Sequence, residues 1–332
     1  MGAYNTKAVE DYWSNFDCAE SDKNFYAFPP IRSRSSKLIF NEFDASRKDW
    51  CEYWTVEKYL KDKIPFKKCL SICCGFGEIE RNLVRLNLAE KMYGTDIAPG
   101  AIETAQKRAK EEGFTNIEYF VADINTMDFA AEEYDIIWAN GALHHIKELD
   151  TVIPKLFHTL KKGGYLIANE YVGPNYQQLS LRQQEIINAV KHLLPEELAR
   201  KTKFPQKSKR PVLSKALRKV DGKLFPEQPT KHTTFDKIWE MKPVEHFLNY
   251  DPSEGVNSIN IIPVLRKSFT DMEVKYFGGS ILMYALDSKF YNNFDHKNTL
   301  HQKLLELVFQ IEDNLIASGE IGSDNAHIIC RK

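Results

Sequence analysis

The sequence lacks several features that mark special classes of protein. No apolar run approaches the roughly 18 residues that a membrane-spanning helix needs, and the first residues contain no apolar core of a signal peptide. Six cysteines in 332 residues, two of them adjacent at Cys73 and Cys74, do not form a disulfide framework. We therefore expect free thiols and a soluble protein of the reducing cytoplasm.

An excess of charge of one sign is also lacking. Lys and Arg number 45 and Asp and Glu 46, which gives a formal net charge of -1. Such a chain has no global positive field to attract nucleic acid, so nucleic acid is not an expected partner. No cysteines and histidines have the spacing of a zinc site, so we expect no metal. The 43% of hydrophobic and 27% of charged residues are typical of a globular protein.

The most regular part of the chain runs from residue 69 to about residue 172. Short apolar runs typical of strands alternate there with helical patterns of ten to fifteen residues. This alternation predicts an α/β fold, with a mostly parallel sheet and helices on both faces. The expected strands are residues 69–73, 91–96, 116–123, 134–140 and 165–172, and the helix before the last of them should end at Gly163-Gly164.

We expect four parts in the chain. Residues 1–68 are rich in aromatic side chains and should form a helical N-terminal cap of short helices and loops, interrupted at Pro29-Pro30. Residues 69–173 form the nucleotide-binding core, residues 174–250 an inserted helical and basic lid, and residues 251–332 complete the sheet.

The predicted lid contains a basic segment. From Arg200 to Lys223 there are ten Lys or Arg residues and one acid, Asp221. In order of preference, this segment is a solvated loop, an electropositive lid that recruits an anionic small molecule, or a contact with RNA. The near-zero net charge and the lack of an appended nucleic-acid module argue against RNA.

A glycine-containing turn follows the first expected strand, in Ser71-Ile72-Cys73-Cys74-Gly75-Phe76-Gly77. Gly75 and Gly77 would let the backbone approach a ligand closely, and the helix behind them presents free N–H groups. A dinucleotide-binding turn would need a third glycine at position 80, where this chain has Glu80. The turn therefore argues against a dehydrogenase.

Acidic residues end the next two expected strands. Asp96 could accept hydrogen bonds from both ribose hydroxyls of an adenosine, and the alternative is a cap for the helix that begins near Pro99. Asp123 could meet the adenine amino group, and the alternative is a residue that only forms a turn.

Five segments occur in the order found in one large family. SICCGFG, YGTDIA, VADINTMDF, YDIIWANGALHHI and LKKGGYLIANEYVGP together resemble the motifs of the class I S-adenosylmethionine-dependent methyltransferases. The resemblance implies a Rossmann-like seven-stranded sheet whose last two strands are residues 271–277 and 325–331. More narrowly, the chain resembles bacterial small-molecule methyltransferases of type 11 or type 12.

The resemblance also implies S-adenosylmethionine as cofactor. Ser71 and Cys73 depart from the acid and the first glycine that are usual in the family's glycine motif. The cofactor-binding residues that the resemblance implies are Ser71, Cys73, Gly75, Gly77, Asp96, Ile97, Asp123, Ile124 and Asn140.

Candidate catalytic residues follow the fourth and fifth expected strands. His144, Glu170 and Tyr171 would lie where open α/β sheets bind ligands. Each could serve as a base or hold a substrate, or could be purely structural; of the tandem histidines, His144 is preferred for the pocket.

The expected function is methyl transfer to an O or N atom of a small metabolite, anionic if the basic segment is a lid. The alternatives are an RNA or protein methyltransferase and a non-catalytic cofactor-binding subunit that supports a partner protein. The chain could be a monomer or a homodimer.

Overall fold

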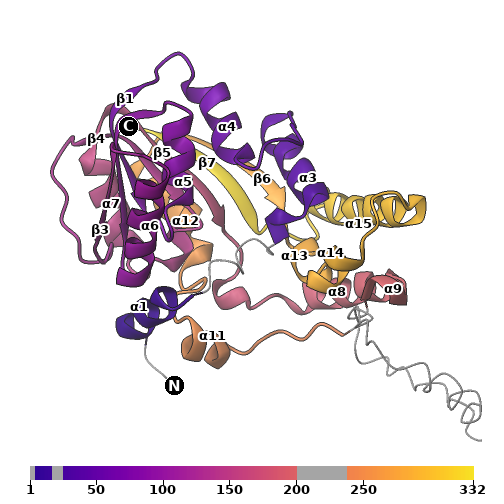
Figure 1. Cartoon of the computed structure of the whole chain (residues 1–332). Coiled ribbons are helices and arrows are strands. Elements are labelled where there is room, and N and C mark those ends of the chain that lie inside the picture. The colour runs from indigo at the N-terminus through magenta and orange to yellow at the C-terminus, as the bar shows by residue number, and fades with distance from the viewer. Residues whose placement is uncertain (1–3, 17–24, 200–237) are drawn as a thin grey trace, which may run out of the picture.

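The structure is a computed structural model, which describes residues 4–16, 25–199 and 238–332 (Figure 1). The basic segment 200–223 that we interpreted as a loop, lid or RNA contact lies outside the described residues. In the part of the chain that the structure describes, no helix combines the length and apolar character needed to cross a membrane.

A seven-stranded sheet organises the molecule, in the order β3-β2-β1-β4-β5-β7-β6. β1 to β5 are parallel, and β7 runs antiparallel to both of its neighbours. The predicted fold class is confirmed, including the two last strands. The strands are β1 (Phe66–Ile72), β2 (Ala89–Asp96), β3 (Ile117–Val121), β4 (Tyr134–Asn140), β5 (Leu160–Tyr171), β6 (Asp271–Gly278) and β7 (Asn325–Arg331).

Alternate residues of the strands enter two different apolar layers, because successive side chains in a strand point to opposite faces. Ile137 and Ala139 of β4 belong to a cluster with α7 (Leu149–Thr159) and α12 (Ile261–Ser268). Ile136 and Trp138 belong to a second cluster with α5 (Glu78–Arg85) and the π-helical turn η2 (Val56–Leu60). These helices cover the sheet, while α6 (Pro99–Glu111) packs against β2 and β3 (Figure 1).

The N-terminal segment is helical, as predicted, with one correction. Pro29 and Pro30 do not interrupt the cap but begin α3 (Pro29–Phe40). Proline is well suited to the first helical turn, because its fixed φ is helical and its missing N–H would have no partner there. The other elements of this segment are α1 (Thr6–Ser14), η1 (Phe25–Ala27), α4 (Trp50–Thr55) and η2.

A second correction concerns residues 160–164, which we expected to end a helix. α7 ends at Thr159, and β5 begins at Leu160, which pairs with Tyr134. A register shift between Tyr134 and Ile136 accommodates this start of the strand. Gly163 adopts a φ of +76° and donates its N–H to the carbonyl of Lys332, so the glycines lie at an irregularity of the strand.

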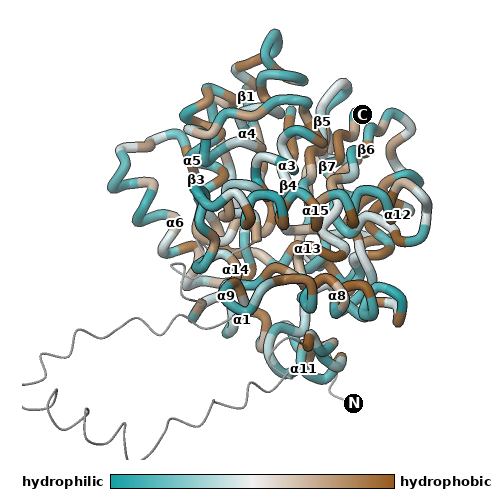
Figure 2. The backbone as a smooth tube through the Cα atoms, turned by 90° about the vertical axis from the view of Figure 1, so that its right-hand side faces the viewer, coloured by the Kyte–Doolittle hydropathy of each residue, from teal (hydrophilic) through white to brown (hydrophobic). Residues whose placement is uncertain are grey.

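Helices from the later part of the chain form a separate apolar cluster together with Phe25, Phe28 and Ile31. In Figure 2, hydrophobic positions (brown) alternate with hydrophilic ones (teal) along the tube of such helices. The remaining elements are η3 (Leu143–His145), η4 (Asn175–Gln177), α8 (Leu181–Leu193), α9 (Glu196–Ala199), α11 (Val244–Tyr250), η6 (Ser258–Asn260), α13 (Leu282–Ala285), α14 (Ser288–Asn293) and α15 (Thr299–Ala317). The division of the chain into four parts stays a prediction.

A buried histidine joins β7 to the N-terminal segment. His327 Nε2 lies 3.2 Å from Thr55 Oγ1, and that hydroxyl donates its own proton to the Cys51 carbonyl at 2.6 Å. Nε2 must therefore carry a proton, which leaves Nδ1 free to accept from the Cys51 thiol. Burial, and then the charge of Lys275, lowers the pKa of His327 to about 3.

We expect His327 to make the protein acid-sensitive. The unfolded chain binds a proton at this residue below about pH 6.5, whereas the folded chain does not until about pH 3, so stability falls as the pH decreases through this window. His327 alone should contribute a loss of about 2 kcal/mol between pH 7 and pH 5. Urea unfolding at several pH values should show a smaller loss in His327→Gln than in the parent.

The comparison with the parent isolates His327 from other groups. Burial raises the pKa of Glu52 and of Glu80 to about 7, and these carboxyls act on stability in the opposite direction over the same range. A variant whose stability falls with acid as steeply as that of the parent would contradict the prediction.

Candidate active site

A cavity of about 230 Å³ lies where β1, β2 and β4 end. The turn after β1 and the ends of β2 and β4 form its walls, and Val9 and Trp13 of α1 cover it. Seven of the nine predicted cofactor residues line this cavity: Cys73, Gly75, Asp96, Ile97, Asp123, Ile124 and Asn140.

The other two predicted cofactor residues, Ser71 and Gly77, do not line the cavity. Ser71 is buried within β1, in register with Gly94 on one side and Trp138 on the other. Gly77 begins α5 with a φ of +74°, and a Cβ there would lie 2.5 Å from the hydroxyl oxygen of Tyr119. The structure thus gives Gly77 a packing role.

Two residues of the glycine turn adopt the left-handed conformation beside the cavity. Gly75 has a φ of +51°, and a Cβ there would meet no atom of the described residues within 4 Å. Cys73, which stands where the family usually has glycine, has a φ of +48° despite its side chain. This conformation costs a residue other than glycine about 1–2 kcal/mol. Burial raises the pKa of the Cys73 thiol well above its usual value, so the thiol stays protonated.

Asp96 joins the glycine turn after β1 to the start of α6. Its Oδ2 accepts the N–H of Gly75 at 2.9 Å, and its Oδ1 accepts the N–H of Ala98 at 3.0 Å. The N-cap of α6 is Ala98, so Asp96 is not itself the cap that we considered as an alternative. Because a carboxylate oxygen can accept more than one hydrogen bond, both oxygens keep acceptor capacity toward the cavity.

Asp123 and Asn125 form a tight turn after β3. Asp123 Oδ1 accepts the backbone N–H of Asn125 and its side-chain amide, both at 2.9 Å. The turn-forming alternative and the ligand-binding prediction are therefore compatible, since Asp123 forms the turn and also lines the cavity.

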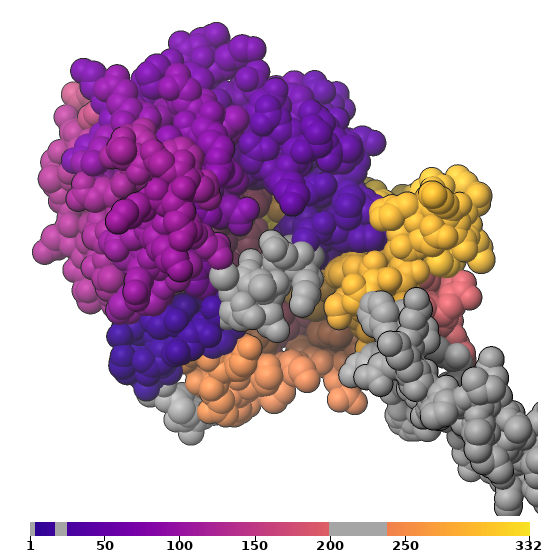
Figure 3. Space-filling model, in the orientation of Figure 1, coloured from indigo at the N-terminus to yellow at the C-terminus, as the bar shows by residue number. Residues whose placement is uncertain are grey.

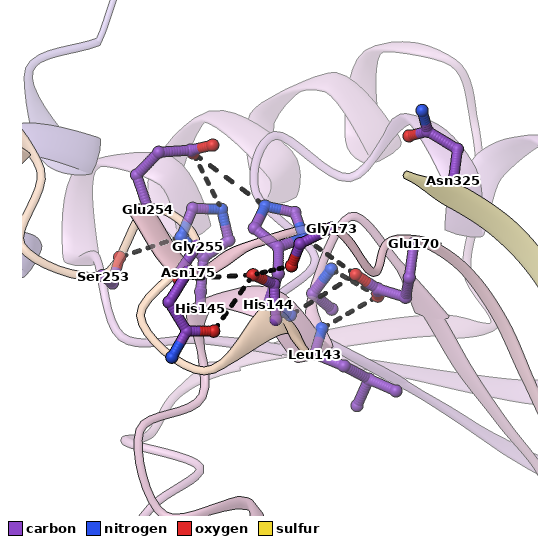
Figure 4. A network of polar contacts seen from close by, with 12 residues as sticks. Leu143, His144, His145, Glu170, Gly173, Asn175, Ser253, Glu254, Gly255 and Asn325 are labelled. Atoms are coloured by element: carbon purple, nitrogen blue, oxygen red, sulfur yellow. Dashed lines mark hydrogen bonds and ion pairs between the residues drawn. The ribbon is translucent and has the colours of Figure 1, made fainter. Parts of the chain in front are cut away.

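The predicted catalytic residues do not belong to the lining of the cavity. Figure 4 shows the contacts of two of them, His144 and Glu170. Glu170 Oε1 accepts the N–H groups of Ala142 and Leu143, both at 2.8 Å, and Oε2 lies 2.8 Å from His144 Nδ1. Its buried carboxylate thus holds the turn after β4. The hydroxyl of Tyr171 donates to the carbonyl of Pro174 at 3.1 Å, and burial raises its pKa far above the usual value.

The histidine that lines the cavity is His145, whereas the sequence favoured His144. His145 Nδ1 lies 2.9 Å from Ser253 Oγ, and its ring stands edge-on to Trp13 with 5.4 Å between the ring centroids. Trp13 and Ser253 also line the cavity, and sequence reasoning missed both. One indication of a histidine in the cavity wall was present in the sequence, namely the tandem pair His144 and His145, of which one was expected to face the pocket.

The surroundings shift the pKa values of His144 and His145 in opposite directions. Burial tends to lower the pKa of His144, but the hydrogen bond and charge of Glu170, with the charges of Glu254 and Asp251, raise it to about 8. Burial and the neighbouring His144 lower the pKa of His145. Three carboxylates, Glu170, Glu254 and Asp251, thus act on the two histidines with negative charge.

Aromatic side chains join the two helices that cover this end of the sheet. Tyr12 of α1 and Tyr250 of α11 lie with 4.7 Å between their ring centroids. Figure 3 shows these two helices next to each other on one side of the molecule, α1 in indigo and α11 in orange. Residues from opposite parts of the sequence thus enclose the cavity.

Comparison with known proteins identifies the family. A model that describes a methyltransferase domain matches residues 66–242, more than half of the chain. The chain belongs to the class I S-adenosylmethionine-dependent methyltransferases. The resemblance to the class I family is thereby confirmed, and S-adenosylmethionine is the cofactor of that family.

Individual relatives are distant. The chain is 24% identical over 142 residues to 2-phytyl-1,4-naphtoquinone methyltransferase of Trichormus variabilis, a match that covers 42% of this chain and 62% of the relative. It is 24% identical over 182 residues to phosphoethanolamine N-methyltransferase 1 of Triticum aestivum, covering 52% and 36%. The chain spans about half the length of the curated relatives that it matches.

Similarity to one solved structure is weak. Phosphoethanolamine N-methyltransferase 2 of Haemonchus contortus, in complex with S-adenosyl-L-methionine, is similar over 99% of this chain and 60% of its own, with 16% identity and a TM-score of 0.47.

The cavity fits the cofactor in its chemistry. Asp96 offers a carboxylate held in place by two backbone N–H groups, which suits the two neighbouring hydroxyls of a ribose. Gly75 leaves open space beside it, and Asp123 adds a second acid, so the lining favours a ligand with a positive centre.

The two glycines of the turn should respond differently to the same substitution. We expect Gly77→Ala to destabilise the fold by about 2 kcal/mol or more, because the new Cβ would overlap Tyr119 and Ala105. Gly75→Ala should cost only the backbone strain of about 1–2 kcal/mol but should weaken binding of S-adenosylhomocysteine, because its methyl group enters the cavity. Thermal unfolding and calorimetric titration of both variants would measure this, and equal stability losses would contradict it.

Proposed function

We propose that this chain transfers the methyl group of S-adenosylmethionine to an O or N atom of a small metabolite. The observation that carries the proposal is a single cavity that joins the predicted adenosine-binding residues to His145 and Trp13. The family membership supports the reaction type, and the cavity supports a compact acceptor held beside the cofactor.

We assign separate roles in cofactor binding, acceptor binding and water exclusion to the residues around the cavity. Asp96 and Asp123 would hold the ribose and the adenine, and Asn140 would lie at the methionine end. The bound cofactor supplies an electrophilic methyl group on its sulfonium centre. His145 would contact the acceptor, while Glu170 holds the turn that carries both histidines. α1 and α11 would keep water from the reacting atoms, which favours transfer over hydrolysis.

The acceptor class is proposed from the cavity wall. Tyr4 and Trp13 give the wall an aromatic surface, and His145 and Ser253 add polar groups beside it. Among the relatives, one is named for a naphtoquinone and another for phosphoethanolamine. We propose a small acceptor with an apolar or planar body and a nucleophilic oxygen or nitrogen; the proposed anionic character depends on residues 200–223.

Cofactor binding tests the first half of the proposal. We expect S-adenosylhomocysteine, and not NADH, to bind in a calorimetric titration. Asp96→Ala should weaken binding by about 1.5–3 kcal/mol, or roughly 10- to 100-fold, as expected for hydrogen bonds to a charged group.

Asp128→Ala is a matched control, because the Asp128 side chain is 99% exposed and lies outside the cavity lining. Its affinity should equal that of the parent. An unchanged affinity in Asp96→Ala would refute the ribose assignment. Transfer of a labelled methyl group to small phenols, hydroxyquinones and amines would then test the acceptor class, and transfer to RNA or protein alone would overturn it.

A further inference from the structure

Two imidazoles and a carboxylate converge beside the cofactor cavity, and no part of the proposed methyl transfer uses them together. His144, His145 and Glu254 each offer one ligand atom, and these atoms lie within 4.8 Å of one another. Glu254 Oε2 is 3.9 Å from the Nε2 atom of each histidine. This distance is too long for a hydrogen bond, so the three atoms surround a small gap (Figure 4).

The other nitrogen of each imidazole already has a partner. His144 Nδ1 lies 2.8 Å from Glu170, a carboxylate, which can only accept. Ser253 Oγ donates to Asp251 Oδ1 at 2.6 Å, so it accepts from His145 Nδ1 at 2.9 Å. In the neutral imidazoles both Nδ1 atoms therefore carry the proton, and both Nε2 atoms present lone pairs toward Glu254.

Three electron-pair donors that face one gap can bind one cation between them. The surroundings are acidic, because Glu170 and Asp251 are also buried beside the pair. Asp251 Oδ2 lies 3.8 Å from His145 Nδ1 and has no hydrogen-bond partner among the described residues. Even when His144 carries a proton, the three carboxylates leave a formal charge of about -2 at this buried site, which favours a bound cation, and a metal ion on Nε2 would release that proton.

We propose that His144 Nε2, His145 Nε2 and Glu254 bind a divalent transition-metal ion of the zinc type. Bonds of about 2.0–2.1 Å would place tetrahedral ligand atoms about 3.4 Å apart. The two 3.9 Å spacings from Glu254 would then contract by about half an ångström, and the spacing between the two imidazole nitrogens, which is within 4.8 Å, by at most about 1.4 Å. A ligand histidine typically donates its other N–H to a carboxylate or hydroxyl, and both histidines do so here.

The ligand set selects the class of ion. Two imidazoles with one carboxylate suit zinc and its first-row neighbours, whereas magnesium and calcium prefer sites built from oxygen. Three protein ligands leave at least one coordination position for water or for an oxygen atom of the methyl acceptor. His145 lines the cavity, so such an ion would act on an acceptor hydroxyl by lowering its pKa.

Direct titration tests the site without cofactor or acceptor, so its outcome is separate from that of the methyl-transfer proposal. The full chain, freed of metal by a chelator, would be titrated with Zn²⁺ by calorimetry and with Co²⁺ by visible absorption. We expect one equivalent of Zn²⁺ to bind, no binding of millimolar Mg²⁺, and visible bands from bound Co²⁺.

Variants assign the ion to these residues. Glu254→Gln and His145→Ala should each weaken Zn²⁺ binding by more than 100-fold, and Ser253→Ala, which removes the partner of His145, by about 10- to 100-fold. His192→Ala, at an exposed histidine of α8, is the matched control and should bind Zn²⁺ like the parent. Far-ultraviolet circular dichroism would verify that each variant is folded.

Three results would overturn the proposal. The first is the absence of stoichiometric Zn²⁺ binding in the parent chain, and the second is an unchanged affinity in both Glu254→Gln and His145→Ala. The third is a thiolate charge-transfer band in the Co²⁺ spectrum, which would place the ion on a cysteine such as Cys73.

Discussion

The turn that follows β4 depends on one buried carboxylate. Glu170 lies at the end of β5, and the neighbouring strand ends in backbone N–H groups that have no partner within the sheet. By accepting from the backbone of Ala142, Leu143 and His144, Glu170 satisfies those donors, and it also fixes the direction of the His144 imidazole. A local requirement of the backbone, that buried N–H groups find acceptors, thereby positions the side chains beside the cavity. Glu170 was itself one of the candidate bases. Its two oxygens already accept hydrogen bonds from the turn after β4, and the side chain does not line the cavity.

A second buried glutamate outside the cavity lining also accepts backbone N–H groups. Glu312 of α15 accepts the N–H groups of Ile281 and Leu282 at 2.8 and 3.0 Å, which are the first donors of α13. Arg34 of α3 pairs with the same carboxylate at 3.0 Å, and both side chains are buried. Here the charge joins three segments that are distant in sequence. In both places, a buried glutamate accepts backbone N–H groups and so has a structural role.

The parts of the fold that could be predicted are those that short sequence patterns determine. Alternating apolar runs indicated β4 to the residue, and strand ends indicated Asp96 and Asp123 because parallel strands bring their carboxyl ends to one edge. Trp13, Ser253 and Glu254 could not be found in this way, since their positions depend on packing between segments over a hundred residues apart. The proposed metal cluster could not be found from ligand spacing either, because its third member, Glu254, is remote in sequence from the two histidines. The choice between His144 and His145 depended on which imidazole Glu170 would hold, which no local pattern reveals.

The position of β7 has a consequence for how the chain is made. This strand is the last in sequence, yet it lies between β5 and β6 and provides the pairing partner of both. While the ribosome is still synthesising residues before 325, β5 exposes an unpaired edge and β6 has no strand beside it. Exposed edges invite pairing with other chains, so the nascent protein passes through a long interval of vulnerability to aggregation. The sheet can close only when residues 325–331 have emerged from the ribosome, so the complete sheet forms only after β7 has been synthesised.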